Sequence, residues 1–243
     1  MYLQDYFGFL IALAVCMVFS AIASGKVKSA FAKYDRVRTR SGMTGYDTAR
    51  RLMGAYGVHG ISIGQVSGTL SDHYDPTKGI VNLSDSTYGS ASVAAVAVAA
   101  HEMGHVMQKQ QSYLFYNIRS TLVPIVNIGS HLAMPLVLLG VVLDALILTV
   151  NSDLGFHVAM VGVLLYGGSL VFALVTLPVE LNASRRAKAM LLDQGILAPN
   201  EIGGAQQVLS AAALTYLASL ATSAVYFLRF LLYVLSIFGR RRD

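Results

Sequence analysis

The hydrophobic pattern divides the chain into long apolar runs and one mixed stretch. Four runs are long enough to cross a bilayer, which takes about 20 residues. They cover residues 6–24, 124–150, 156–178 and the second half of 205–238. Only a short polar segment around Asn151, Ser152 and Asp153 separates the second run from the third, so we expect a tight transmembrane hairpin there. The last run contains no Gly or Pro and predicts a single helix of about 50 Å, whose first third extends beyond the membrane.

The mixed stretch, residues 40–121, carries both helix and strand signals. Thr44 followed three residues later by Asp47 resembles a capping box and predicts a short amphipathic helix. Three strand-like pieces follow, over residues 61–66, 69–74 and 80–84, with a turn between the last two. A helix over about residues 90–110 comes next. Because residues 93–100 are apolar on every face, we expect this helix to be buried.

Composition supports a membrane protein. The chain is 55% hydrophobic and 13% charged, with a mean hydropathy of +0.57, which excludes an ordinary water-soluble domain and a disordered chain. The single cysteine, Cys16, lies in an apolar run, so a disulfide framework and a thiolate zinc cluster are excluded as well. A metal site would have to use histidine and carboxylate.

Basic residues indicate the orientation. None precedes Lys26, whereas residues 26–40 contain six and residues 185–188 contain three. The positive-inside rule therefore places the amino terminus outside and residues 25–121 in the cytoplasm, although three arginines near the carboxyl terminus disagree. Since residues 1–5 carry no positive charge, the first run is interpreted as an uncleaved anchor. The predicted organisation is a 1–24 anchor, a 25–121 cytoplasmic part, a 122–179 transmembrane hairpin, a 180–204 cytoplasmic helix and a 205–243 long helix.

The buried helix carries the sequence His-Glu-Met-Gly-His at positions 101–105. Histidines four residues apart on a helix share one face, so His101 and His105 can both reach one Zn²⁺ at about 2.0 Å. Glu102 points about 100° away, toward a water on the metal rather than the metal. A buried carboxylate also loses solvation unless a cation compensates it. This pattern predicts a zinc site.

A catalytic zinc needs a third protein ligand and an open position for water. The candidates are His59, His73, Glu180 and Glu201. Glu180 is favoured because two membrane crossings separate it from His105 and return the chain to the same side. Pro178 is expected to end the third span, with Glu180 at the start of a new polar helix. A simple role at that helix N-terminus is the alternative.

Four segments resemble one family. They are Asp-His-Tyr-Asp-Pro (72–76), Ala-Val-Ala-Ala-His-Glu-Met-Gly-His (97–105), Leu-Val-Pro-Ile-Val-Asn-Ile-Gly-Ser (122–130) and Leu-Pro-Val-Glu-Leu-Asn-Ala-Ser-Arg-Arg-Ala (177–187). In this order they resemble the YugP-type neutral zinc metallopeptidases of bacterial membranes. The resemblance implies zinc ligands His101, His105 and Glu180, with Glu102 as general base, in a gluzincin-like arrangement.

More distantly, the layout is similar to that of membrane zinc proteases with a cytoplasmic site, which often place Asp four residues after the third ligand. Here that position is Ser184, so Ser184 or Asn182 is a candidate to orient a ligand histidine. The fold class expected is an α-helical integral membrane protein with about four transmembrane helices and a small cytoplasmic α+β zincin-like catalytic domain.

The expected function is a metalloendopeptidase of the bacterial cytoplasmic membrane, with one catalytic Zn²⁺ and its site facing the cytoplasm. Zinc-activated water would attack the peptide carbonyl while Glu102 takes the proton. Candidate oxyanion donors are His73, Tyr74, Arg185 and Arg186. Residues 80–84 would either bind an extended substrate by strand addition or form an ordinary inner strand.

Other classes stay open. A protease cutting within the bilayer would carry its motif inside a span, whereas residues 93–100 are too short to span and no Asp-Gly partner motif occurs in a later span. A zinc-stabilised scaffold would not need Glu102, and a transporter would place its ligands at the membrane midplane. An inactive family member is a further alternative. The expected partners are a peptide or protein substrate, including membrane proteins, and the lipid bilayer. Nucleic acid is not expected, and self-association is left open.

Overall fold

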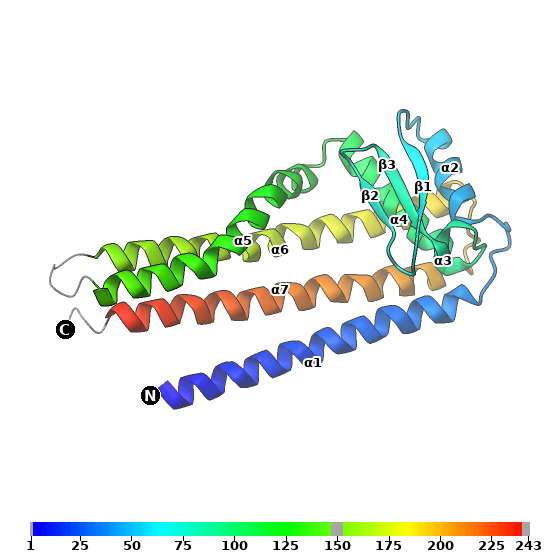
Figure 1. Cartoon of the computed structure of the whole chain (residues 1–243). Coiled ribbons are helices and arrows are strands. Elements are labelled where there is room, and N and C mark those ends of the chain that lie inside the picture. The colour runs from blue at the N-terminus through cyan, green and yellow to red at the C-terminus, as the bar shows by residue number, and fades with distance from the viewer. Residues whose placement is uncertain (1, 147–152, 240–243) are drawn as a thin grey trace. The chain divides into compact units, whose positions relative to one another are not determined.

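A computed structural model describes residues 2–146 and 153–239, with side chains from residue 7 to residue 238 in those ranges. The elements in chain order are α1 (Tyr2–Asp35), α2 (Gly45–Ala55), β1 (Ser62–Val66), β2 (His73–Asp75), β3 (Ile80–Ser84), α3 (Asp85–Tyr88), α4 (Val93–Gln110), α5 (Leu114–Leu146), α6 (Leu154–Asp193) and α7 (Ile202–Gly239) (Figure 1). The prediction of a mostly helical chain with a small sheet is confirmed. The predicted turn at residues 151–153 falls largely outside the described residues.

Among the described residues, four helices are long and apolar enough to cross a membrane, as the hydrophobic pattern predicted. The stretches are Phe7–Asp35, Leu114–Leu146, Leu154–Asp193 and Ile202–Phe238. Large apolar side chains on these helices are exposed, for example Ile11, Ile128 and Leu164 at 64–66%. Lipid tolerates such a surface, whereas a soluble monomer rarely carries one of this extent.

The helices continue further than the apolar runs. Pro178 was expected to end a helix before Glu180, and this expectation is wrong, because α6 passes through Pro178 without a break. A proline removes one backbone hydrogen bond, and the bonds on either side of it can hold the helix together. Pro124 and Pro135 lie inside α5 in the same way.

The chain forms two compact units. The helical unit comprises Met1–Ser20, Asn117–Leu177 and Leu217–Asp243. The sheet unit comprises Ala21–Tyr116 and Pro178–Tyr216. The helices α1, α5, α6 and α7 each contribute residues to both units.

The sheet has the strand order β1-β3-β2. β1 runs parallel to β3, with Ser62 opposite Ile80, and β2 runs antiparallel to β3, with Tyr74 opposite Val81. Both sides of β3 are therefore paired, so the idea that residues 80–84 accept a substrate strand is wrong and the inner-strand interpretation holds. β2 is shorter than predicted, because Leu70 has a left-handed backbone (φ 58°) that interrupts the extended conformation before it.

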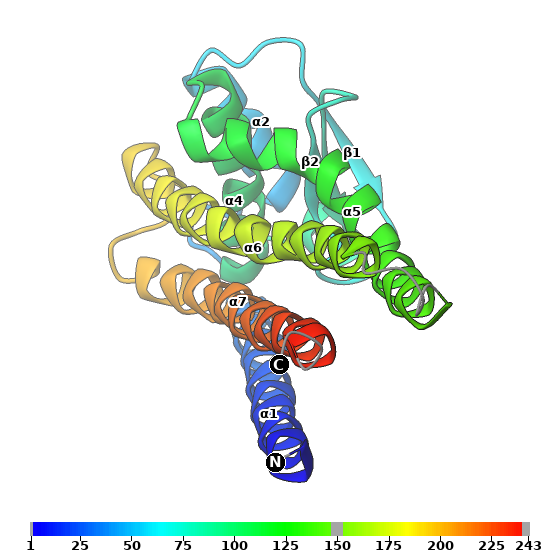
Figure 2. The same cartoon turned by 90° about the vertical axis from the view of Figure 1, so that its left-hand side faces the viewer.

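The core of the sheet unit forms around α4, which is buried along most of its length as predicted. The helix begins after Ser92, whose hydroxyl accepts a hydrogen bond from the Ala95 N–H. α2 begins with the predicted capping box of Thr44 and Asp47. The strands β2 and β3 lie beside α4 (Figures 1 and 2). The core cluster includes Leu52, Leu83, Met103, Leu191 and Leu197.

Candidate metal centre

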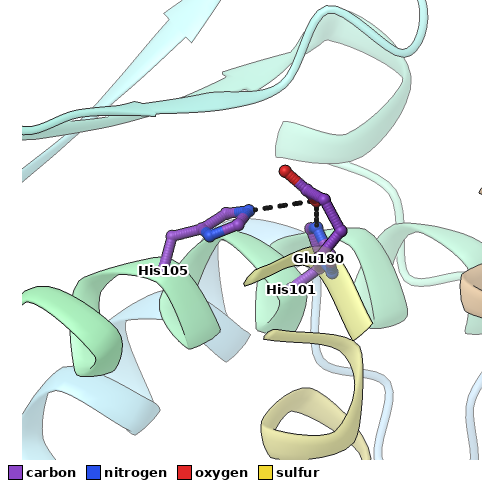
Figure 3. A group of neighbouring side chains, drawn as sticks. All are labelled: His101, His105 and Glu180. Carbon is purple, nitrogen blue, oxygen red and sulfur yellow. Dashed lines mark hydrogen bonds and ion pairs between the residues drawn. The ribbon is translucent and has the colours of Figure 1, made fainter. Parts of the chain in front are cut away.

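Two elements of the sheet unit supply the candidate site. α4 carries His101 and His105 one turn apart, and α6 carries Glu180. Gly104 lets these helices approach closely, since a Cβ at this position would lie 2.7 Å from the backbone oxygen of Ala183. Figure 3 shows both imidazoles directed at the Glu180 carboxylate. Residues 79 positions apart in the sequence thus meet at one point.

The three side chains present their donor atoms to a common centre. His101 Nε2 lies 3.2 Å and His105 Nε2 lies 3.5 Å from the same Glu180 oxygen, Oε2. All three donor atoms are within 4.8 Å of one another. Ligands at about 2.0–2.1 Å from a tetrahedral zinc stand about 3.3 Å apart. The donor set and its spacing therefore fit zinc.

The second nitrogen of each imidazole faces an oxygen. Ser184 Oγ is 3.2 Å from His101 Nδ1, and Gln108 Oε1 is 3.0 Å from His105 Nδ1. The Gln108 amide nitrogen donates to the Val179 carbonyl at 2.8 Å, which fixes the amide so that its oxygen faces His105. His105 must then donate from Nδ1, and its Nε2 keeps a lone pair for a metal.

Glu102 is buried, with 6% of its surface exposed. Burial raises the pKa of this carboxyl to about 7; the charge of His101 opposes that rise and the charge of Glu180 adds to it. The backbone N–H of Tyr74, on β2, donates to the carboxylate. A carboxyl group with a pKa near 7 can take up and release a proton at neutral pH.

Two other predicted residues lie next to the centre, Ser184 in contact with His101 and Asn182 in contact with Gln108, which meets His105. Ser184 meets His101, as described above, and Asn182 Oδ1 accepts hydrogen bonds from Gln108 at 2.9 Å and from Arg186 Nε at 2.7 Å. Arg186 also donates to Gln111. Both Asn182 and Ser184 therefore lie where they can orient the histidines.

The remaining candidates lie outside the metal group. His73, on β2, contacts the Ser71 carbonyl and the Asn82 amide, and Tyr74 beside it is half-buried. His59 and Arg185 are exposed. The Glu201 carboxylate accepts from the backbone N–H groups of Arg40 and Ala198, close to the start of α7. Among the alternatives for a third donor, the structure brings Glu180 and not His59, His73 or Glu201 to the two histidines.

Sequence reasoning missed Gln108. It lies three residues after His105, on the same side of the helix, and that spacing is the only signal the sequence offers. Its partners Val179 and Asn182 are more than 70 residues away, and only the fold shows that they meet.

Comparison with known proteins agrees with this geometry. Residues 9–235 match the family described as "putative neutral zinc metallopeptidase". The chain is also 42% identical over 214 residues to the "Putative membrane protease YugP" of Bacillus subtilis (strain 168), covering 88% of this chain and 91% of that protein. No solved structure matches the chain. Since both matches span most of the chain, this protein belongs to the family described in those words.

Proposed function

We propose that this protein is a membrane-embedded, zinc-dependent metalloendopeptidase in which His101, His105 and Glu180 hold one catalytic Zn²⁺. The observation that carries the proposal is the convergence of three donor atoms at zinc-like spacing beside the buried carboxyl of Glu102. A purely structural site would have no use for a neighbouring carboxyl of this kind. The family match agrees with the reaction class.

Each side chain has a role in this proposal. When bound, zinc supplies a Lewis acid that polarises a peptide carbonyl and makes water more acidic. Glu102 takes the proton from the attacking water and returns it to the leaving amine, which its pKa near 7 favours. Ser184 and Gln108 hold the two imidazoles in place. The oxyanion donor is proposed to be His73, Tyr74, Arg185 or Arg186; of these, His73 and Arg186 already have hydrogen-bond partners.

We further propose that the site faces the cytoplasm of a bacterial cell and that the enzyme lies in the cytoplasmic membrane. Basic residues flanking the apolar helices on the side of the sheet unit support this orientation. The substrates would be peptides or proteins that reach the membrane surface, including membrane proteins.

The test measures zinc content and peptide cleavage for the detergent-purified full chain. Glu102→Gln should retain zinc and lose at least about 100-fold of the activity, because proton transfer is removed while the ligands stay. His101→Ala and Glu180→Ala should both lose zinc. His59→Ala, at an exposed histidine outside the centre, is the matched control and should behave like wild type.

Two results would contradict the proposal. Full zinc content in Glu180→Ala would remove this residue from the ligand set. The second result is a zinc-loaded wild type that cleaves no peptide in a diverse mixture, together with a Glu102→Gln variant that does not differ from it in any measured property. That result would favour a zinc-stabilised scaffold.

A further inference from the structure

A cavity of about 290 Å³ opens beside His101 and Glu102, entirely within the sheet unit. Three helices line it. α1 contributes residues from Ser24 to Lys28, α4 contributes Val98 with the two site residues, and α7 contributes residues from Val208 to Tyr216. Each helix presents positions three and four residues apart, so one face of every helix turns toward the cavity. The cavity is therefore continuous with the candidate metal centre.

The walls of this cavity are mainly apolar. They include Val27, Val98, Val208, Leu209 and Ala212. Two of the polar side chains that line the cavity already have partners. The Asp72 carboxylate accepts from the Ser84 N–H at 2.7 Å and from the Ser84 hydroxyl at 2.9 Å, while the Thr215 hydroxyl donates to the Ala212 carbonyl at 2.7 Å. Ser24, Lys28 and Tyr216 line the cavity as well, but most of its lining surface is apolar.

One lining residue of the cavity carries backbone strain. Leu70, in the loop between β1 and β2, has a φ of 58° and is 36% exposed. A large non-glycine residue in the left-handed region costs free energy and persists only where its surroundings hold it. Strain of this kind concentrates at binding sites. Here the strained residue adds an apolar side chain to the lining of the cavity.

We propose that this cavity receives a large apolar side chain, such as Leu, Met or Phe, of the substrate residue that flanks the hydrolysed bond. The inference rests on the proposed peptidase function. Neighbouring residues of a peptide are about 3.8 Å apart, so a chain whose carbonyl reaches Glu102 brings an adjacent side chain to the cavity. Its volume is at the lower end for ligand pockets, which suits one side chain.

Cleavage-site profiling tests the proposal. The zinc-loaded, full-length wild type is given peptides that differ only at the positions flanking the cut. We expect kcat/KM for Leu, Met or Phe to exceed that for Ala by at least about tenfold at one of these positions, since a missing methylene in an apolar pocket alone costs about tenfold or more. Ala212→Phe, which fills the cavity from α7, should reverse this preference toward Ala and Gly.

The matched control is Ala213→Phe, the same substitution at the next position of α7, which does not line the cavity. It should keep the wild-type preference. An unchanged preference in Ala212→Phe, with zinc content and cleavage rate retained, would overturn the proposal. So would a wild type that prefers charged or small residues at both flanking positions.

A binding measurement separates the cavity from catalysis. The chain has one cysteine, so Cys16→Ala combined with Ala212→Cys and Glu102→Gln gives an inactive protein with a single thiol in the cavity. A pentapeptide with a central Leu should slow maleimide labelling of this thiol, and the same peptide with a central Asp should not. If the Leu peptide protects the thiol from labelling but the wild type cleaves no peptide, the result would support the proposed role of the cavity and refute the proposed peptidase function. Equal labelling with and without either peptide would refute the cavity.

Discussion

At the scale of single residues, the buried Gln108 side chain links His105 to α6. We predict that Gln108→Ala weakens zinc binding by about 10–100-fold, the usual effect of removing a group that orients a ligand histidine. The histidine loses the acceptor of its Nδ1–H, and the Val179 carbonyl loses its donor. Competition with a chelating dye measures the Kd. Gln110→Ala, an exposed glutamine on the same helix, should keep the wild-type Kd, and equal affinity in both variants would contradict the prediction.

The site residues that could be identified from the sequence either lie close together in the chain or belong to a residue type that is rare in it. His101, Glu102 and His105 lie within five positions, and Glu180 is one of three glutamates in the chain. Ser184 was found by its spacing from Glu180, and it does meet His101. Gln108 was not found, because glutamine is common and its hydrogen bonds join distant parts of the chain.

At the scale of elements, the close contact of α4 with α6 determines where Glu180 lies. We predict that Gly104→Ala pushes these helices apart, because its Cβ would lie 2.7 Å from the Ala183 oxygen and 3.1 Å from the Ala183 Cα, both backbone atoms. The expected cost is about 1–3 kcal/mol in the free energy of unfolding, as for overpacking. Zinc affinity should fall as well, because Glu180 moves with α6.

The matched control is Gly54→Ala in α2, where a Cβ would meet no atom within 4 Å. This variant should gain about 0.4–1 kcal/mol, since alanine restricts the unfolded chain and fits a helix. Denaturant unfolding of the metal-free proteins gives both free energies, and chelator competition gives the zinc affinities. A Gly104→Ala protein as stable as Gly54→Ala, with wild-type zinc affinity, would show that the helices are not held at this spacing.

Elements with a local signal were predicted well, and those set by tertiary contacts were not. The capping box at Thr44 and the N-terminus of α4 depend on neighbouring residues, so sequence reasoning located both helices. The position of β3 between β1 and β2 depends on pairing across the sheet, which the strand pattern does not specify. The sequence does not indicate that α6 continues through Pro178, because a proline usually ends a helix, whereas here the surrounding helix tolerates it.

At the scale of the whole molecule, run length alone identified the four apolar helices, because about 20 apolar residues are a strong signal. Which segments of the chain make up each of the two units was harder to predict from the sequence. The sheet unit joins Ala21–Tyr116 with Pro178–Tyr216, segments that are separated by two apolar runs. Only the return of the chain after two crossings suggested that they meet.

Orientation in the membrane gives the last prediction. Six basic residues between positions 26 and 40 and three between 185 and 188 favour a cytoplasmic sheet unit, with the turn before α6 on the outer side. In a Cys16→Ala background, an impermeant maleimide applied to intact bacterial cells should label Asp153→Cys. It should label Lys78→Cys, at a side chain that is 79% exposed between β2 and β3, only after the membrane is permeabilised. The reverse labelling pattern would place the candidate metal centre outside the cell. In that case the arginines at the carboxyl terminus, and not those after α1, would determine the topology.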